Sequence, residues 1–578
     1  MPNPNQSPAP DATSDASMTL YARVRRWFDR NILELGRELR LSYIPPLMVY
    51  LAAGISGLTG IVGTFFVKEY LGLSAEFLAA LGFWTMLPWA LKMPLGHLVD
   101  LLWPHKAGLI YIGASLVALS LLIMVGLLAD PGVMSDIMAP EKWYVLSAIL
   151  GPLGYVLQDV VADAMTVEAV PRADADGRPL TDEQIHLGHT TMQTLGRVAI
   201  IGGTILVAAA NVYMFSGAEA LSTPQKAAVY LKIYQLALVI PLVSSGGVVL
   251  AGFLRRRSAQ RLARQGLTEA EIERLLNVRS SEPPDVNWWI LGGGLAFLLF
   301  SLVMGLTAPP FNEEIVFAGS IGIVLFLMWR LTEDLEPQAR RNLLGTAAVI
   351  FAFRAIPTTG AGSSWWMIDA LGFDQQFLSQ LSLLASALAL FGMFIFRRFM
   401  AERPITYVIA VLTIAGAILY LPNIALFYGL HHWTAAHTGG VVDARFIALI
   451  DTALESPLGQ IAMIPMLAWI ANSAPQQLKA TYFAVMAAFT NLALALSQLV
   501  TKYLNQAFTV TREVKDALTG AVTTPADYSQ LGELFILVAA LSLMVPLATI
   551  YVVKNILFLI RESDGRDASL PEPTRRFR

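Results

Sequence analysis

Two pairs of acidic residues lie inside long apolar stretches of this chain. Asp159 and Asp163 are one helical turn apart in GPLGYVLQDVVADAMTVEAV, and Asp451 and Glu455 repeat the spacing in IALIDTALESPLGQIAMIPMLAW. If these stretches are helical, each pair lies on one helix face. A carboxylate near the centre of a membrane helix costs about 2.5–3.5 kcal/mol on insertion scales, and such residues usually face a bundle interior or a water-filled cavity. The two pairs therefore indicate where solutes or protons move through an apolar protein.

The two pairs differ in their position along the stretches. Asp159 and Asp163 lie in the inner third of theirs, so two interpretations stay open: binding of substrate or protons, or a gate pair held by Arg or Lys of the other half of the chain. Asp451 and Glu455 lie deeper, and here we favour substrate binding or proton coupling. A buried carboxylate binds protons closer to neutral pH, which suits a group that loads and releases them.

Two arginines and two tryptophans complete the candidate site. Arg197 and Arg354 lie in apolar stretches and stay charged, so each needs an anion. That anion is either an acidic residue of the protein or a carboxylate of a bound solute, and the two pairings can alternate. Trp365 and Trp366 offer aromatic faces to a flat ring. We assign Asp100 and Glu168, at the edges of apolar stretches, to gating.

Composition places the chain in a membrane. Of its 578 residues, 55% are hydrophobic and only 14% are charged, and the mean hydropathy is +0.56. Soluble domains carry about 25% charged residues. The net charge of −3 and the lack of a basic stripe argue against a nucleic-acid partner. Without cysteine there are no disulfides or cysteine metal sites. We expect no cofactor and no metal, and we interpret His431, His432 and His437 as a solvated loop.

Runs of about 20 apolar residues, the length that crosses the hydrocarbon core, predict fourteen membrane spans. They centre on 46–67, 75–97, 107–129, 143–166, 189–213, 229–253, 287–308, 314–331, 343–367, 376–397, 404–427, 444–471, 479–504 and 531–556. Arginines gather in the connections of one side, which predicts that both termini are cytoplasmic. One connection on the opposite side, with Lys502, Arg512 and Lys515, is discordant.

The spans predict six domains. These are a disordered tail and cytoplasmic or interfacial helix (1–42), a first half of six helices (43–253), a cytoplasmic linker (254–286), an inserted two-helix hairpin (287–332), a second half of six helices (333–560) and a cytoplasmic tail (561–578). Each half carries an acidic pair in its fourth span. Parallel repeats of this kind build major facilitator transporters, with the site between the two halves.

Several motifs are similar to those of one transporter family. LGHLVDLLWPHK resembles the G-x-L-x-D loop of the major facilitator superfamily, with Gly96 and Asp100 at the matching positions. The segments LPWALKMPLGHLVD, LQDVVADAMTVE, FRAIPTTGAGSSWWMIDALGFDQQFL and DTALESPLGQIAMIPMLAWIANSAPQQLKATYFAVMAAFTNLA resemble, in order, those of the folate–biopterin transporter family.

The resemblance implies an all-α polytopic major facilitator fold that carries pterins or folates by alternating access. We expect it in the bacterial cytoplasmic (inner) membrane, with a small anionic or pterin-like substrate, protons and the lipid bilayer as partners. A carboxylate suits the adjacent N–H and amine of a pterin, and an arginine suits the carboxylates of folate. The alternatives are a carrier of muropeptides, which share a Q-D-x-V-x-D-A stretch, and a non-transporting membrane protein. The spans hold hardly any histidine, so we do not expect an enzyme.

Overall fold

The computed structural model describes residues 39–567 except for short internal gaps, at 72, 171–179, 219–220, 277–285, 308, 334–335, 397–398, 400–402, 460, 462–465, 467–478 and 516–521. The tail and interfacial helix expected before residue 39 lie outside the described residues. So do the last eleven residues of the expected cytoplasmic tail, 568–578.

The described chain is almost entirely helical. Up to the linker, its elements are η2 (Leu41–Tyr43), α3 (Ile44–Ile55), η3 (Ser56–Thr59), α4 (Gly60–Tyr70), α5 (Ala75–Met86), η4 (Leu87–Leu91), α6 (Lys92–Leu101), η5 (Trp103–His105), α7 (Ala107–Ala129), α8 (Pro131–Ile137), α9 (Pro140–Ala169), α10 (Asp182–Met214), α11 (Thr223–Ala237), α12 (Val239–Arg264) and α13 (Glu269–Leu276). The remainder comprises α14 (Trp288–Thr307), α15 (Asn312–Leu331), α16 (Pro337–Arg354), α17 (Ala361–Asp369), α18 (Gln375–Ile395), α20 (Ile405–Leu419), α21 (Leu421–Phe427), α22 (Leu430–His437), α23 (Ala444–Glu455), η7 (Ser456–Leu458), α25 (Lys479–Ala507), β1 (Val514–Lys515), β2 (Val522–Thr524) and α26 (Leu531–Asp567).

Eleven helical stretches of the described residues are long and apolar enough to cross a membrane. They coincide with eleven of the fourteen expected spans. The other three are interrupted: the second is divided into α5, η4 and α6, the ninth into α16 and α17, and the twelfth is described only as far as α23 and η7. Pro88, Pro94 and Pro357 lie in the second and ninth, and proline removes a helix hydrogen bond. The count of fourteen stays a prediction.

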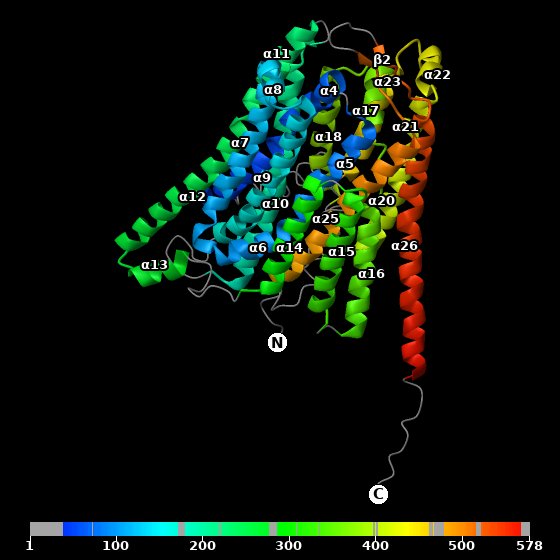
Figure 1. Ribbon diagram of the computed structural model, residues 1–578. Helices are drawn as coiled ribbons and strands as arrows, with labels where there is room; N and C mark the ends of the chain where they lie inside the picture. Colours follow the sequence, from blue (N-terminus) through cyan, green and yellow to red (C-terminus); the bar gives the residue numbers. More distant parts are fainter. Residues whose placement is uncertain are drawn as a thin grey trace, which may run out of the picture.

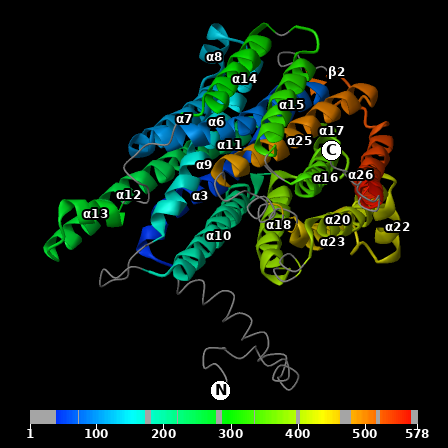
Figure 2. The same ribbon diagram turned by 90° about the horizontal axis from the view of Figure 1, so that it is seen from below.

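The helices form two groups that stand side by side (Figures 1 and 2). Residues 43–253, here called the first half, form one group, and residues 333–560, the second half, form the other; that each is a separate six-helix domain stays a prediction. The free end of α12 and α13 lies at the bottom of Figure 1, while α8 and α22 lie at the top. Because α12 ends in five arginines, we name these the inner and the outer end, following the predicted orientation.

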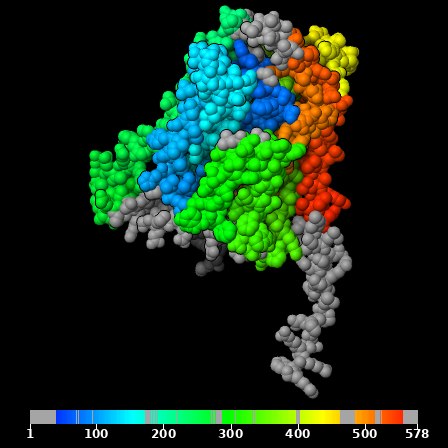
Figure 3. Space-filling model, viewed as in Figure 1, coloured from blue at the N-terminus to red at the C-terminus, as the bar shows by residue number. Residues whose placement is uncertain are grey.

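The inserted hairpin, α14 and α15, lies against both halves (Figure 3). On the first half, the Trp84 indole N–H donates to Glu313 Oε1 at 3.2 Å, and the ring of Pro94 abuts Gly294. On the second half, Lys502 Nζ lies 3.3 Å from Glu313 Oε2 and 3.1 Å from Glu314 Oε1. Glu313 thus joins all three parts of the chain.

The break between α16 and α17 is stabilised by hydroxyl groups of α25. The Ser497 hydroxyl donates to the Ile356 carbonyl at 2.6 Å, and the Thr358 N–H donates to the Thr501 hydroxyl at 2.9 Å. Gly360 then starts α17 with a φ of 70°, a conformation that favours glycine. Irregular backbone is tolerated at membrane depth only where protein or water satisfies its polar groups. This break positions Arg354 on one side and the two tryptophans on the other.

Glycines bring the central helices of the first half into close contact. A Cβ on Gly54 of α3 would lie 2.2 Å from the Ile200 carbonyl oxygen of α10, and Gly203 faces it. Gly57, the next glycine of the same segment, has nothing within 4 Å of such a Cβ. Small residues at helix interfaces allow this approach, so Gly54 is a packing residue and Gly57 is not.

We therefore expect Gly54→Ala to destabilise the protein, because the added methyl group must separate α3 from α10. Overpacking of this kind costs about 1–3 kcal/mol. The melting temperature of the purified protein in detergent should fall, while that of the control Gly57→Ala should change little. Equal melting temperatures of the two variants would contradict this assignment.

Candidate functional site

The first acidic pair is held by a lysine of the same half. Lys92 Nζ, at the start of α6, lies 2.6 Å from Asp159 Oδ2 and 2.8 Å from Asp163 Oδ2 of α9. The Tyr50 hydroxyl of α3 donates to Asp163 Oδ1 at 2.7 Å. The side chains of Lys92 and Asp159 are each only 20% exposed. We call these four residues the Lys92 cluster.

The charge of the Lys92 cluster extends to α10. Two carboxylates share one lysine, so the cluster carries an excess negative charge. The Arg197 guanidinium lies within electrostatic reach of Asp159 and Tyr50. Arg197 forms no ion pair with another described residue. It is therefore the second cation of this region, and it balances part of the excess negative charge of the Lys92 cluster.

Lys92 is a residue that the sequence analysis did not single out. The alternative of a gate had paired Asp159 and Asp163 with a basic residue of the other half, whereas the structure gives them a partner from their own. The signal was present, because a lone lysine in an apolar stretch needs a carboxylate. Its helix was difficult to recognise, since Pro88 and Pro94 interrupt the apolar pattern.

The residues assigned to gating lie near the inner end of the first half. Glu168 Oε1, in the last turn of α9, lies 2.7 Å from Lys106 Nζ, just before α7. Lys106 also lies 4.2 Å from the ring centroid of Trp103. Asp100 is in α6, one residue before its end. The pairing of Glu168 stays within one half.

The second acidic pair is differently placed. Asp451 of α23 is only 8% exposed, and its Oδ2 accepts from the Asn423 amide at 2.9 Å. Its Oδ1 is buried and has no hydrogen-bond partner among the described residues. Glu455, at the end of α23, is exposed. The pair thus combines a buried carboxylate that lacks a cation with an accessible one.

The two tryptophans of α17 point into different surroundings. Trp366 packs between Phe427 and Phe535, with ring centroids at 5.5 and 5.9 Å, and so belongs to the core of the second half. Trp365 lines a cavity and carries the Arg512 guanidinium 5.3 Å from its ring centroid. Arg354 ends α16, where its Nη1 lies 3.6 Å from Met466 Sδ. Of these three candidates, the structure brings only Trp365 to a cavity.

A set of polar contacts joins the two halves at the outer end. Lys68 Nζ of α4 lies 2.6 Å from Asp369 Oδ1 at the end of α17. The Tyr528 hydroxyl donates to Asp369 Oδ2 at 2.5 Å, and Arg512 donates to the Val67 carbonyl. Burial, and then the bond to Asp369, raise the pKa of Tyr528 well above its usual value, so that it stays a donor. We call these contacts the outer clasp.

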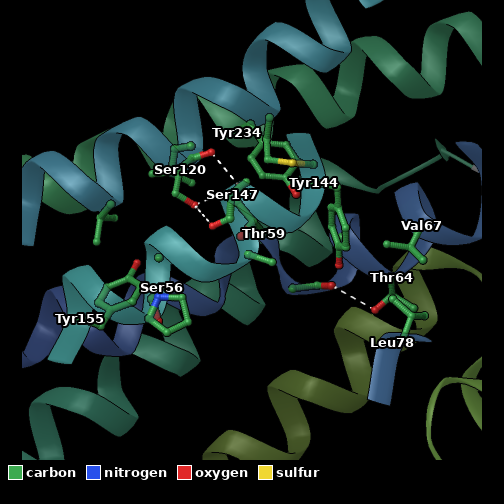
Figure 4. Close-up of a pocket in the computed structure, with 18 of the residues that line it drawn as sticks. Ser56, Thr59, Thr64, Val67, Leu78, Ser120, Tyr144, Ser147, Tyr155 and Tyr234 are labelled. Carbon is green, nitrogen blue, oxygen red and sulfur yellow. Dashed lines mark hydrogen bonds between the residues drawn. The ribbon is translucent and has the colours of Figure 1, made fainter. Parts of the chain in front are cut away.

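A cavity of about 430 Å³ lies beneath the outer clasp (Figure 4). It is formed by helices of the first half, namely α4, α5, α7, α9 and α11 with η3, and by α17 of the second half. Nine hydroxyl-bearing side chains line it, and none of its described lining residues is charged. The charged candidates Asp159, Arg197 and Asp451 do not line it.

Comparison with known proteins finds similarity to one family and a shared fold. The profile of the BT1 family matches residues 321–572. A folate-biopterin transporter of Synechocystis sp. is 22% identical over 482 residues, which are 83% of this chain and 77% of that protein. A solved mutant peptide transporter in complex with sulfate is 14% identical, with a TM-score of 0.56 over 90% of this chain and 94% of that one. A solved mutant nucleoside transporter is 11% identical, with a TM-score of 0.51 over 89% and 99%. The two structures show a shared transporter fold.

The Lys92 cluster predicts an asymmetric effect of charge removal. Lys92→Met leaves the largely buried Asp159 and the half-exposed Asp163 without their cation. Breaking a fully buried ion pair costs about 3–5 kcal/mol, and we expect a smaller loss here because water reaches Asp163. Removing the negative charges as well, with Asp159→Asn and Asp163→Asn, should restore much of that loss. Thermal unfolding of the single, double and triple variants measures this coupling. A triple variant no more stable than Lys92→Met would contradict the ion-pair description.

Proposed function

We propose, from its similarity to the BT1 family and to a folate-biopterin transporter, that this chain carries pterin- or folate-type solutes across the membrane together with protons. The transporter assignment itself follows from the family and the fold, and the chain is a multi-pass membrane protein rather than an enzyme. The substrate and the coupled ion are proposals. The observation that carries the coupling is the buried carboxylate of Asp451.

Asp451 is suited to carry the proton. An ionised carboxylate without a cation is costly in an apolar environment, and among the described residues Asp451 has only the Asn423 amide, on one of its oxygens. Glu455 lies one turn away at the exposed end of the same helix, where it can exchange protons with water. We propose that Asp451 is protonated in the conformation described here and ionises when the site opens.

Positively charged side chains are proposed to bind the anionic part of the substrate. Arg197 and Arg354 are the arginines of the apolar stretches, and a guanidinium binds a carboxylate through two parallel hydrogen bonds. We propose that they hold the glutamate tail of a folate. The Lys92 cluster then keeps Asp159 and Asp163 from competing for Arg197, and Asp100 and Glu168 act at the inner gate.

Alternating access is supported by the outer clasp. It fastens α4 of one half to α17 of the other by the ion pair of Lys68 with Asp369, and α4 to the segment after α25 by the hydrogen bond from Arg512 to the Val67 carbonyl. We propose that it opens when the halves rock about the site between them, as in related folds. We further propose that the protein lies in a bacterial cytoplasmic membrane, with both termini inside, on the basis of the arginine distribution.

Uptake into proteoliposomes tests the substrate and the coupling together. Radiolabelled pterin, folate and muropeptide are supplied in parallel, with and without an inward proton gradient. We expect gradient-driven uptake of pterin or folate and a loss of at least tenfold in Asp451→Asn, since an amide cannot release a proton. Asp527→Asn, in an exposed loop, is the matched control. Proton coupling would be refuted if uptake persisted without the proton gradient and was also unchanged in Asp163→Asn or in Asp451→Asn. Uptake of muropeptide but not of pterin or folate would refute the proposed substrate class.

Breaking the outer clasp should change access to the cavity. The chain has no cysteine, so a single introduced thiol reports without background. We expect Ser364→Cys in α17 to react several-fold faster with a membrane-impermeant maleimide when Lys68→Gln and Asp369→Asn are added. Ser216→Cys, on the outer surface, should react equally in both backgrounds. No change at residue 364 would show that these contacts do not close the outer end.

A further inference from the structure

The cavity beneath the outer clasp lies within the first half rather than along the seam between the halves. Its walls come from helices between residues 56 and 234, and among the described residues the second half contributes only Ala361, Ser364 and Trp365 of α17. None of the acidic or arginine candidates reaches it. The site proposed above therefore leaves this cavity without a role.

The hydroxyl groups around the cavity fall into two classes. Ser120 and Ser147 bond to each other and to each other's carbonyl groups, at 2.7 to 3.0 Å, so they are satisfied within the protein (Figure 4). Tyr144, Tyr234 and Thr59 have no hydrogen-bond partner among the described residues. Tyr234 is only 5% exposed. None of these three oxygens is among the fully buried unpaired atoms of the described residues, so each is open to a hydrogen-bond partner inside the cavity.

The chemistry of the lining defines what this partner is. The absence of charged groups among the described lining residues excludes a tightly bound ion, because a buried charge needs a countercharge. Tyr144, Tyr155 and Trp365 add aromatic surface, on which a flat ring packs well. A volume of about 430 Å³ lies in the range of small-molecule sites. The lining thus suits a neutral, flat molecule with several hydrogen-bonding edges.

We propose that this cavity binds the uncharged pterin ring, through the hydroxyls of Tyr144, Tyr234 and Thr59 and the face of Trp365. The proposal rests on the transport function proposed above and deepens it. The ring and the charged tail of a folate are then recognised separately, the ring by neutral hydroxyls and the tail by arginines. The helix α17 covers the cavity and ends in Asp369 of the outer clasp. The bound ring would therefore lie directly beneath the contact that joins the halves.

Equilibrium binding of labelled biopterin and folate to the purified full chain tests the hydrogen bonds. One neutral hydrogen bond corresponds to a loss of about threefold to tenfold. We expect Tyr234→Phe and Thr59→Val each to weaken both ligands by this factor, and to the same degree, because the ligands share the ring. Tyr551→Phe removes a hydroxyl from a residue that is 69% exposed, and it should bind both ligands like the unaltered chain.

A pair of glycine variants tests the location independently of any tyrosine. Gly60 lines the cavity, Gly57 does not, and a Cβ on either meets nothing within 4 Å. Gly60→Leu should therefore abolish binding of the ring by filling the cavity, while Gly57→Leu should bind normally, with the melting temperature of each variant checking that it is folded. Unaltered pterin binding by folded Gly60→Leu and Tyr234→Phe would overturn the cavity site and leave the transport function standing. Failure of the unaltered chain to bind any pterin would overturn both.

Discussion

The ion pairs of Lys92 with Asp159 and Asp163 are the contact on which the first half depends most. In a bilayer there is little water to solvate a lone charge, so these three charged groups are stable only together. This requirement fixes the start of α6 against the middle of α9 and, through Tyr50, against α3. Uncharged polar groups at membrane depth need partners as well. The backbone groups of the break between α16 and α17 find theirs in the hydroxyls of Ser497 and Thr501.

Much of this arrangement was predictable from the sequence, because the signals are local. Eleven of the expected spans have counterparts in the structure. The segments around Asp159 and Asp451 also carry the resemblance to the transporter family. Spans whose helix is interrupted were more difficult to predict. Hydropathy averages over a window, whereas the paths of α5 to α6 and of α16 to α17 depend on single prolines and on hydroxyl groups from α25, a distant helix. Lys92 lies in one of these interruptions.

Choices of packing partner were not predictable. Trp365 and Trp366 are adjacent and chemically identical, yet one lines a cavity and the other packs between Phe427 and Phe535. Which of the two side chains faces the cavity depends on the rotation of α17 about its own axis, which the periodicity of the sequence does not predict. The discordant basic residues at the outer side are explained in the same way. Lys502 pairs with the inserted hairpin and Arg512 covers Trp365, so these charges serve tertiary contacts rather than orientation.

The inserted hairpin also makes the two seams between the halves unequal. On one edge, α14 and α15 cover the approach of α5 and α6 to α25, fastened by Glu313 to both sides. On the other edge, α10 and α18 meet, no described element covers them as the hairpin does, and a smaller hollow lies between them at Thr204 and Ser386. The two edges are therefore unequal within the plane of the bilayer: one is bridged by a third part of the described chain, and the other is formed by α10 and α18.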